Sequence, residues 1–167
     1  MNTNRRTKTV AFLRIAFGIV WAIDAQFKWQ PAFINNFTDY IQEAVDGQPA
    51  FIQAWLHFWM NLVNVDPRLF AHLVAWGETA VAIGLIFGIF SNLTYIIGAL
   101  LTFTIWAIPE GFGGPYSAGA TDIGTGIIYM FVFAALYLLS AGQYYGLDKR
   151  LRTRLGRLRC LSSAPEK

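Results

Sequence analysis

The chain has 167 residues, of which 55% are hydrophobic and only 14% are charged, and its formal net charge is +3. A soluble domain usually has about 25% charged residues, so this composition argues against an ordinary water-soluble protein. The length allows one domain. The single cysteine, Cys160, excludes a disulfide-exchange centre, because thiol–disulfide chemistry needs a pair.

Four apolar segments, at residues 10–29, 70–90, 92–108 and 123–141, come close to the roughly 20 residues that a helix needs to cross a bilayer. Backbone amides in lipid must bond within their own segment, so helices are expected. We therefore predict an all-α fold, an integral membrane four-helix bundle that occupies residues 1–145. Arg5-Arg6 resembles a twin-arginine export signal, but Arg14 interrupts the apolar run and an uncleaved first span is expected.

Between the first two segments, two runs of apolar residues follow the helical period: Phe33, Phe37 and Ile41, and then Ile52, Trp55, Leu56, Trp59, Met60 and Val63. Both runs predict amphipathic helices at the outer membrane interface. They either fill the gap between spans as surface helices, which we favour, or form a lid over an opening between the spans. Asp66-Pro67 then predicts the capped start of the second span.

Glycines mark close approaches in the second half of the chain. Gly84 and Gly88 form a Gly-x-x-x-Gly pair, which we expect to pack inside the bundle. Residues 109–122 hold four glycines and two prolines and should form a non-helical outer loop. Asp122, at the end of this loop, is predicted to cap the fourth span.

Basic residues lie mostly at the two ends of the chain, where ten of the 13 Lys and Arg are found. This distribution predicts a multi-pass protein of a bacterial-type cytoplasmic (inner) membrane, with both termini in the cytoplasm and four spans. Residues 146–167 form a basic tail, and residues 147–161 within it are predicted to be an amphipathic helix that lies on anionic lipid rather than on nucleic acid.

Charged residues inside the apolar segments are the strongest functional signal. Each ionised group near the bilayer centre costs about 2.5–3.5 kcal/mol, so such residues face the bundle interior and often serve a ligand or ion pathway. Asp24 and Lys28 are one helical turn apart, and Glu78 lies at a comparable depth on the second span. We predict that these three form a polar site in the outer half, with Arg14 as a helix-tying or snorkelling residue.

Neighbouring helix ends supply further candidates for ligand binding: Trp76, Trp106, His72 and Asp122. Together with the three charged residues they would form an apolar pocket with a few polar groups. A haem between the spans would need two membrane histidines, and the only histidines are His57 and His72, both on the outer side. No haem, flavin or metal site is therefore indicated.

The order of these features resembles the DoxX/DoxD-like family of small four-span membrane proteins. The matching residues are Arg14-x-x-x-Gly18, Lys28 and Glu78, followed by Gly84-Leu-Ile-Phe-Gly88. Where such proteins have His-Gly before the lysine, this chain has Ile23-Asp24, and Asp24 is a group that could handle protons there. The resemblance implies a membrane subunit of a quinone-linked redox system, such as thiosulfate:quinone oxidoreductase.

Two classes of function stay open at this point. In the first, aromatic side chains hold a quinone ring, while Glu78, Asp24 or Lys28 handle its protons and a redox partner protein supplies electrons. In the second, the chain is a non-enzymatic membrane scaffold or small permeation protein, and its charges are structural or line a path. Either class allows a homo-oligomer. The absence of an electron-carrier motif in the sequence favours the second class.

Overall fold

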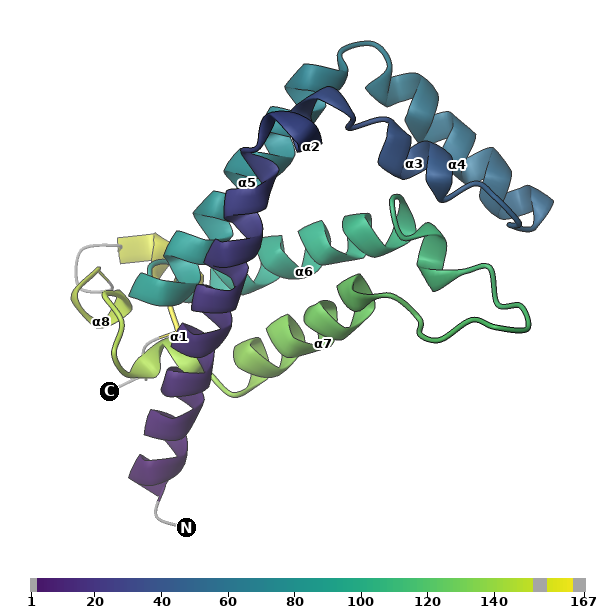
Figure 1. Cartoon of the computed structure of the whole chain (residues 1–167). Coiled ribbons are helices and arrows are strands. Elements are labelled where there is room, and N and C mark those ends of the chain that lie inside the picture. The colour runs from purple at the N-terminus through teal and green to yellow at the C-terminus, as the bar shows by residue number, and fades with distance from the viewer. Residues whose placement is uncertain (1–2, 152–155, 164–167) are drawn as a thin grey trace.

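The computed structural model describes residues 3–151 and 156–163, and this part of the chain is helical and contains no strand (Figure 1). The prediction of an all-α fold is confirmed. The elements, in chain order, are α1 (Thr3–Lys28), α2 (Pro31–Asn35), α3 (Asp39–Glu43), α4 (Ala50–Val63), α5 (Pro67–Phe87), α6 (Ser91–Ala107), η1 (Gly111–Gly113), α7 (Thr125–Leu138), η2 (Ala141–Gln143), α8 (Asp148–Leu151) and η3 (Gly156–Leu161).

The long helices form two pairs. α1 packs along α5 and α6 packs along α7, while α5 and α6 join the pairs. Figure 1 shows the pairs meeting near the C-terminal tail and diverging toward α4. Within the described chain, Thr7–Lys28 and Pro67–Phe87 are long and apolar enough to cross a membrane. Ser91–Ala107 and Thr125–Leu138 are apolar but shorter, so four spans stay a prediction.

The ends of α5 follow from local chemistry. The Asp66 carboxylate accepts a hydrogen bond from the Leu69 N–H at 3.0 Å, and Pro67 occupies the first turn, which confirms the predicted start. The helix stops at Gly88, whose φ of 59° is the left-handed conformation that glycine adopts without strain. Gly84, one turn earlier, packs directly against the Thr94 side chain of α6.

Residues 31–63 form an arch that bridges the diverging ends of the two helix pairs. The first predicted amphipathic helix is two short helices, α2 and α3, and the second is α4. Trp55 Nε1 donates to the Ala107 carbonyl at 2.9 Å, and Gln48 Nε2 donates to the Gly111 carbonyl at 3.0 Å. These bonds hold the arch on the end of α6. The arch has a separate apolar core, in which Ile41, Val45, Leu56 and Val63 pack with Ile108.

The start of α7 differs from the prediction. Asp122 does not cap this helix, because α7 begins at Thr125 and the Asp122 carboxylate accepts from the Gly124 N–H at 2.8 Å in the preceding turn. The first turn of α7 is instead capped from the end of α6. Glu110 accepts a hydrogen bond from the Gly126 N–H at 2.9 Å and another from the Thr125 hydroxyl at 2.7 Å.

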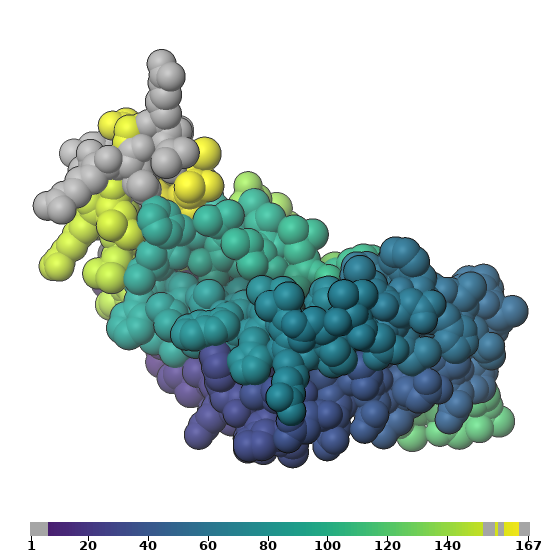
Figure 2. All heavy atoms as spheres, turned by 90° about the horizontal axis from the view of Figure 1, so that it is seen from above, coloured from purple at the N-terminus to yellow at the C-terminus, as the bar shows by residue number. Residues whose placement is uncertain are grey.

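The described part of the tail lies at the end of the molecule opposite the arch, as Figure 2 shows. A continuous helix was predicted here; residues 152–155 lie outside the described part, and on either side of them the chain forms only the short α8 and η3. The Leu147 and Asp148 N–H groups donate to the last carbonyls of α5, at Phe87 and Gly88, both at 3.0 Å. The start of the tail therefore supplies hydrogen-bond donors to the carbonyl groups at the end of α5 and packs against the helices.

Candidate functional site

Three charged side chains from α1 and α5 meet at one point, as the sequence predicts. Lys28 Nζ lies 3.0 Å from Asp24 Oδ2 and 3.6 Å from Glu78 Oε2. The exposed fraction of the side chain falls from 43% for Asp24 through 20% for Lys28 to 0% for Glu78. Trp21 Nε1 also donates to the backbone carbonyl of Glu78 at 3.0 Å, which fixes this part of α5 against α1.

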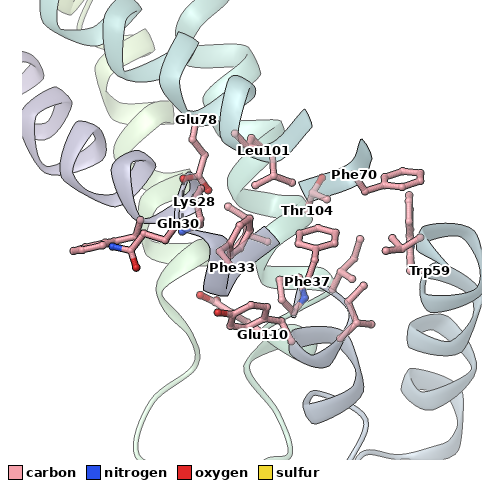
Figure 3. Close-up of a pocket in the computed structure, with 18 of the residues that line it drawn as sticks. Lys28, Gln30, Phe33, Phe37, Trp59, Phe70, Glu78, Leu101, Thr104 and Glu110 are labelled. Atoms are coloured by element: carbon pink, nitrogen blue, oxygen red, sulfur yellow. Dashed lines mark ion pairs between the residues drawn. The ribbon is translucent and has the colours of Figure 1, made fainter. Parts of the chain in front are cut away.

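Lys28 and Glu78 line a pocket of about 510 Å³, a volume within the usual range for small-molecule sites. Figure 3 shows that its walls come from the end of α1, the arch, α5 and α6. α7 contributes none of the lining residues, so no part of the fourth predicted span borders the pocket. Its aromatic walls consist of Phe27, Phe33, Phe37, Tyr40, Trp59 and Phe70.

Two polar groups in this pocket are buried and have no hydrogen-bond partner among the described residues. They are the Trp59 indole N–H and the Glu78 carboxyl group, whose 3.6 Å ion pair with Lys28 is too long for a hydrogen bond. They lie on opposite sides of the pocket, with Phe33 and Phe37 between them (Figure 3). Because an unsatisfied buried polar group costs about 1–3 kcal/mol, both groups favour a ligand that bonds to them.

Four residues proposed as ligand contacts lie outside the pocket lining. Trp76 is 63% exposed and packs edge-on against Trp29, while His72 is bonded to its own helix at the Arg68 carbonyl. Trp106 Nε1 donates to the Ile123 carbonyl at 2.8 Å, and Asp122 lies in the turn described above. The structure does not bring these four side chains together with Glu78.

The residues that sequence reasoning missed are aromatic residues of the arch and Glu110. Phe33, Phe37 and Trp59 carried a visible signal, because they belong to the apolar faces that predicted amphipathic helices. Those faces line the pocket instead of only resting on the membrane interface. Glu110 lines the pocket and also caps α7, and nothing in its sequence neighbourhood marks either role.

A second buried polar cluster lies at the tail end. Arg14 is fully buried and donates from Nη2 to the Tyr145 carbonyl at 2.9 Å, so it ties α1 to the tail and does not reach outward. Its guanidinium lies directly over Gly88. The buried Asp148 carboxylate accepts from the Ser91 N–H at 2.9 Å and the Ser163 N–H at 3.1 Å.

Within the described residues, no group of three or more His, Cys, Asp or Glu side chains is placed to hold a metal ion. Comparison with protein-family models, with curated proteins and with solved structures finds no match to this chain. The site therefore has to be interpreted from its own geometry.

Proposed function

We propose that this protein is a membrane subunit of a quinone-linked redox system and that the pocket beneath the arch holds the quinone ring. The observation that carries the proposal is the pair of unpartnered buried groups, Trp59 N–H and the Glu78 carboxyl, on opposite sides of an aromatic pocket. A quinone carries one oxygen on each side of a flat ring. One oxygen would meet Lys28 and Glu78, and the Trp59 N–H would serve as a donor to a polar group elsewhere on the ligand.

The chemistry of the lining suits such a ring. Phe33 and Phe37 supply aromatic faces for edge or offset stacking. Lys28 Nζ lies 5.6 Å from the centroid of the Phe33 ring, so an ammonium donor already lies beside the aromatic wall. Glu78 can exchange a proton with a reduced oxygen, which is the acid–base work that quinone reduction requires. A redox partner protein would supply the electrons.

The proposal includes a membrane setting with four spans, both termini in the cytoplasm and the arch on the outer side. α1 and α5 are long and apolar enough to cross, and the basic ends favour this orientation. α6 and α7 would be short spans. Under this arrangement the arch is the lid over the pocket, because its aromatic residues form one wall.

Two tryptophans test the proposal as a matched pair. Trp59→Phe keeps an aromatic ring but removes the unpartnered donor, whereas Trp76→Phe makes the same change on an exposed residue outside the pocket. Loss of one hydrogen bond of about 1 kcal/mol should weaken binding of a short-chain quinone about fivefold in Trp59→Phe. Trp76→Phe should bind like the wild type.

Quinone extracted from the protein purified in mild detergent gives a second measurement. The wild type should retain quinone, and Glu78→Gln should retain less because the group that meets the oxygen has changed. If the wild type carries no quinone and binds no short-chain analogue, or if both tryptophan variants bind equally, the pocket does not serve a quinone. The scaffold function would then be the better account.

A further inference from the structure

We propose that Asp24 and Lys28 form a proton route that connects the outer surface with Glu78. This route deepens the proposed function and rests on it for the final proton acceptor, the quinone. It assigns different roles to the three charged residues: only Lys28 and Glu78 line the pocket, and Asp24 is the point of entry from water.

The geometry supports a relay because the contacts are consecutive and burial increases along them. The Lys28 ammonium donates a hydrogen bond to Asp24 at 3.0 Å and lies 3.6 Å from Glu78, so a single ammonium group lies between the two carboxylates. Asp24 is 43% exposed and Glu78 is fully buried. A proton that reaches Asp24 from solvent needs only these two transfers to reach the pocket.

Few other groups of the described chain could carry a proton to Glu78. The titratable residues in the pocket lining, besides Lys28 and Glu78, are Tyr40 and Glu110. The Glu110 carboxylate is engaged by the start of α7. On the side toward the tail, the buried rings of Trp21 and Phe133 pack edge to face with centroids 5.2 Å apart.

The transfer is balanced at each step. The Asp24 carboxylate first takes a proton from the outer water. Lys28 then gives a proton to the Glu78 carboxylate, and the resulting neutral amine takes the proton from the Asp24 carboxyl group, which becomes a carboxylate again. In quinone reduction, electrons arrive from a reduced redox centre of a partner protein, and protonated Glu78 gives its proton to the quinone oxygen. One proton has then moved from the outer water to the ligand, and all three side chains have regained their starting charge.

The test follows hydrogen–deuterium exchange at Glu78 by infrared spectroscopy of the ligand-free protein in lipid nanodiscs. The carboxyl band that disappears in Glu78→Gln reports this group. Asp24→Asn removes the entry point, and Lys28→Arg keeps the positive charge but cannot release a proton. Each should slow exchange of the band at least about tenfold, equivalent to ~1.4 kcal/mol on the barrier. Glu43→Gln, an exposed acid on the arch outside the pocket lining, should leave the rate unchanged.

Unchanged exchange in both Asp24→Asn and Lys28→Arg overturns the relay, and so does the absence of any Glu78-dependent carboxyl band at every pH where the protein stays folded. The two proposals can fail separately. Slowed exchange in a protein that binds no quinone would leave the proton route standing and remove the quinone. Quinone binding with unchanged exchange would leave the quinone site standing and remove the proton route.

Discussion

Gly88→Ala adds a single methyl group, but it should destabilise the protein strongly. Gly88 ends α5 in the left-handed conformation, which costs an alanine about 1–2 kcal/mol. In addition, a Cβ at this position would overlap the Arg14 guanidinium and lie 2.7 Å from the Gly146 Cα. Arg14 is fully buried, so it cannot move aside into solvent.

The magnitude follows from the bond that Arg14 would lose. A hydrogen bond from a charged group contributes about 1.5–3 kcal/mol, and Arg14 makes such a bond to the Tyr145 carbonyl. Added to the backbone cost, the expected loss in the free energy of unfolding is about 2.5–5 kcal/mol. Gly156→Ala is the matched control, because its φ of 51° is similar and a Cβ there meets no atom of the described chain within 4 Å.

Thermal unfolding in a mild detergent measures the difference. Gly156→Ala should show only the backbone cost, and the Tm of Gly88→Ala should be lower than that of the control by about 3–12 °C, at 2–4 °C per kcal/mol for a chain of this size. In an Arg14→Met background, the cost of Gly88→Ala should fall, because only the backbone cost and the overlap with Gly146 remain. Equal costs of Gly88→Ala in both backgrounds would refute the reasoning.

Three further predictions concern the remaining contacts. Glu78→Gln and Lys28→Met should show a coupling free energy of about 0.5–3 kcal/mol in a double-mutant cycle measured by unfolding, and full additivity would mean that the two residues do not interact. Glu110→Ala should lower stability by about 0.5–2 kcal/mol through loss of the α7 cap, whereas Glu43→Ala should have little effect on the same unfolding curve. A green fluorescent protein fused to the C-terminus should fluoresce, and an alkaline phosphatase fused there should be inactive. An active phosphatase would contradict a cytoplasmic C-terminus.

The parts of the fold that the sequence predicted are those with local causes. The all-α class and the start of α5 follow from apolar segment length and from the Asp66-Pro67 pair, both of which act within a few residues. The meeting of Asp24, Lys28 and Glu78 was also predictable, because helix periodicity and rise place them at one depth.

The aromatic wall of the pocket was not predictable in the same way. Trp76 and Trp59 look alike in the sequence, but the rotation of α5 turns Trp76 outward while the fold of the arch brings Trp59 over the pocket. That fold depends on long-range bonds such as Trp55 to Ala107, which no local pattern encodes. Glu110 shows the same limit, since it caps a helix that begins 15 residues later.

The described part of the tail differs from the predicted helix for a related reason. Periodic leucines and arginines indicated one amphipathic helix, whereas the described residues form the short α8 and η3, and the first of them bond to the orphan carbonyls at the end of α5. Leu147 and Asp148 satisfy them, and the buried Asp148 carboxylate then holds the start of α6 at Ser91. The hydropathy pattern of the tail does not reveal this contact, because the unpaired carbonyl groups belong to α5.

The two buried polar clusters bear on the choice between a ligand site and a permeation path. Arg14 and Lys28 lie on the same helix, and the part of α1 between them carries Phe17 and Trp21. These two rings pack with Tyr129 and Phe133 of α7 at centroid separations of 5.1–5.6 Å. A path for ions through this region would need polar groups or water where four aromatic rings are in contact. The Glu78 pocket is thus closed toward the tail by aromatic side chains, an arrangement that fits the proposed proton route from the side of Asp24.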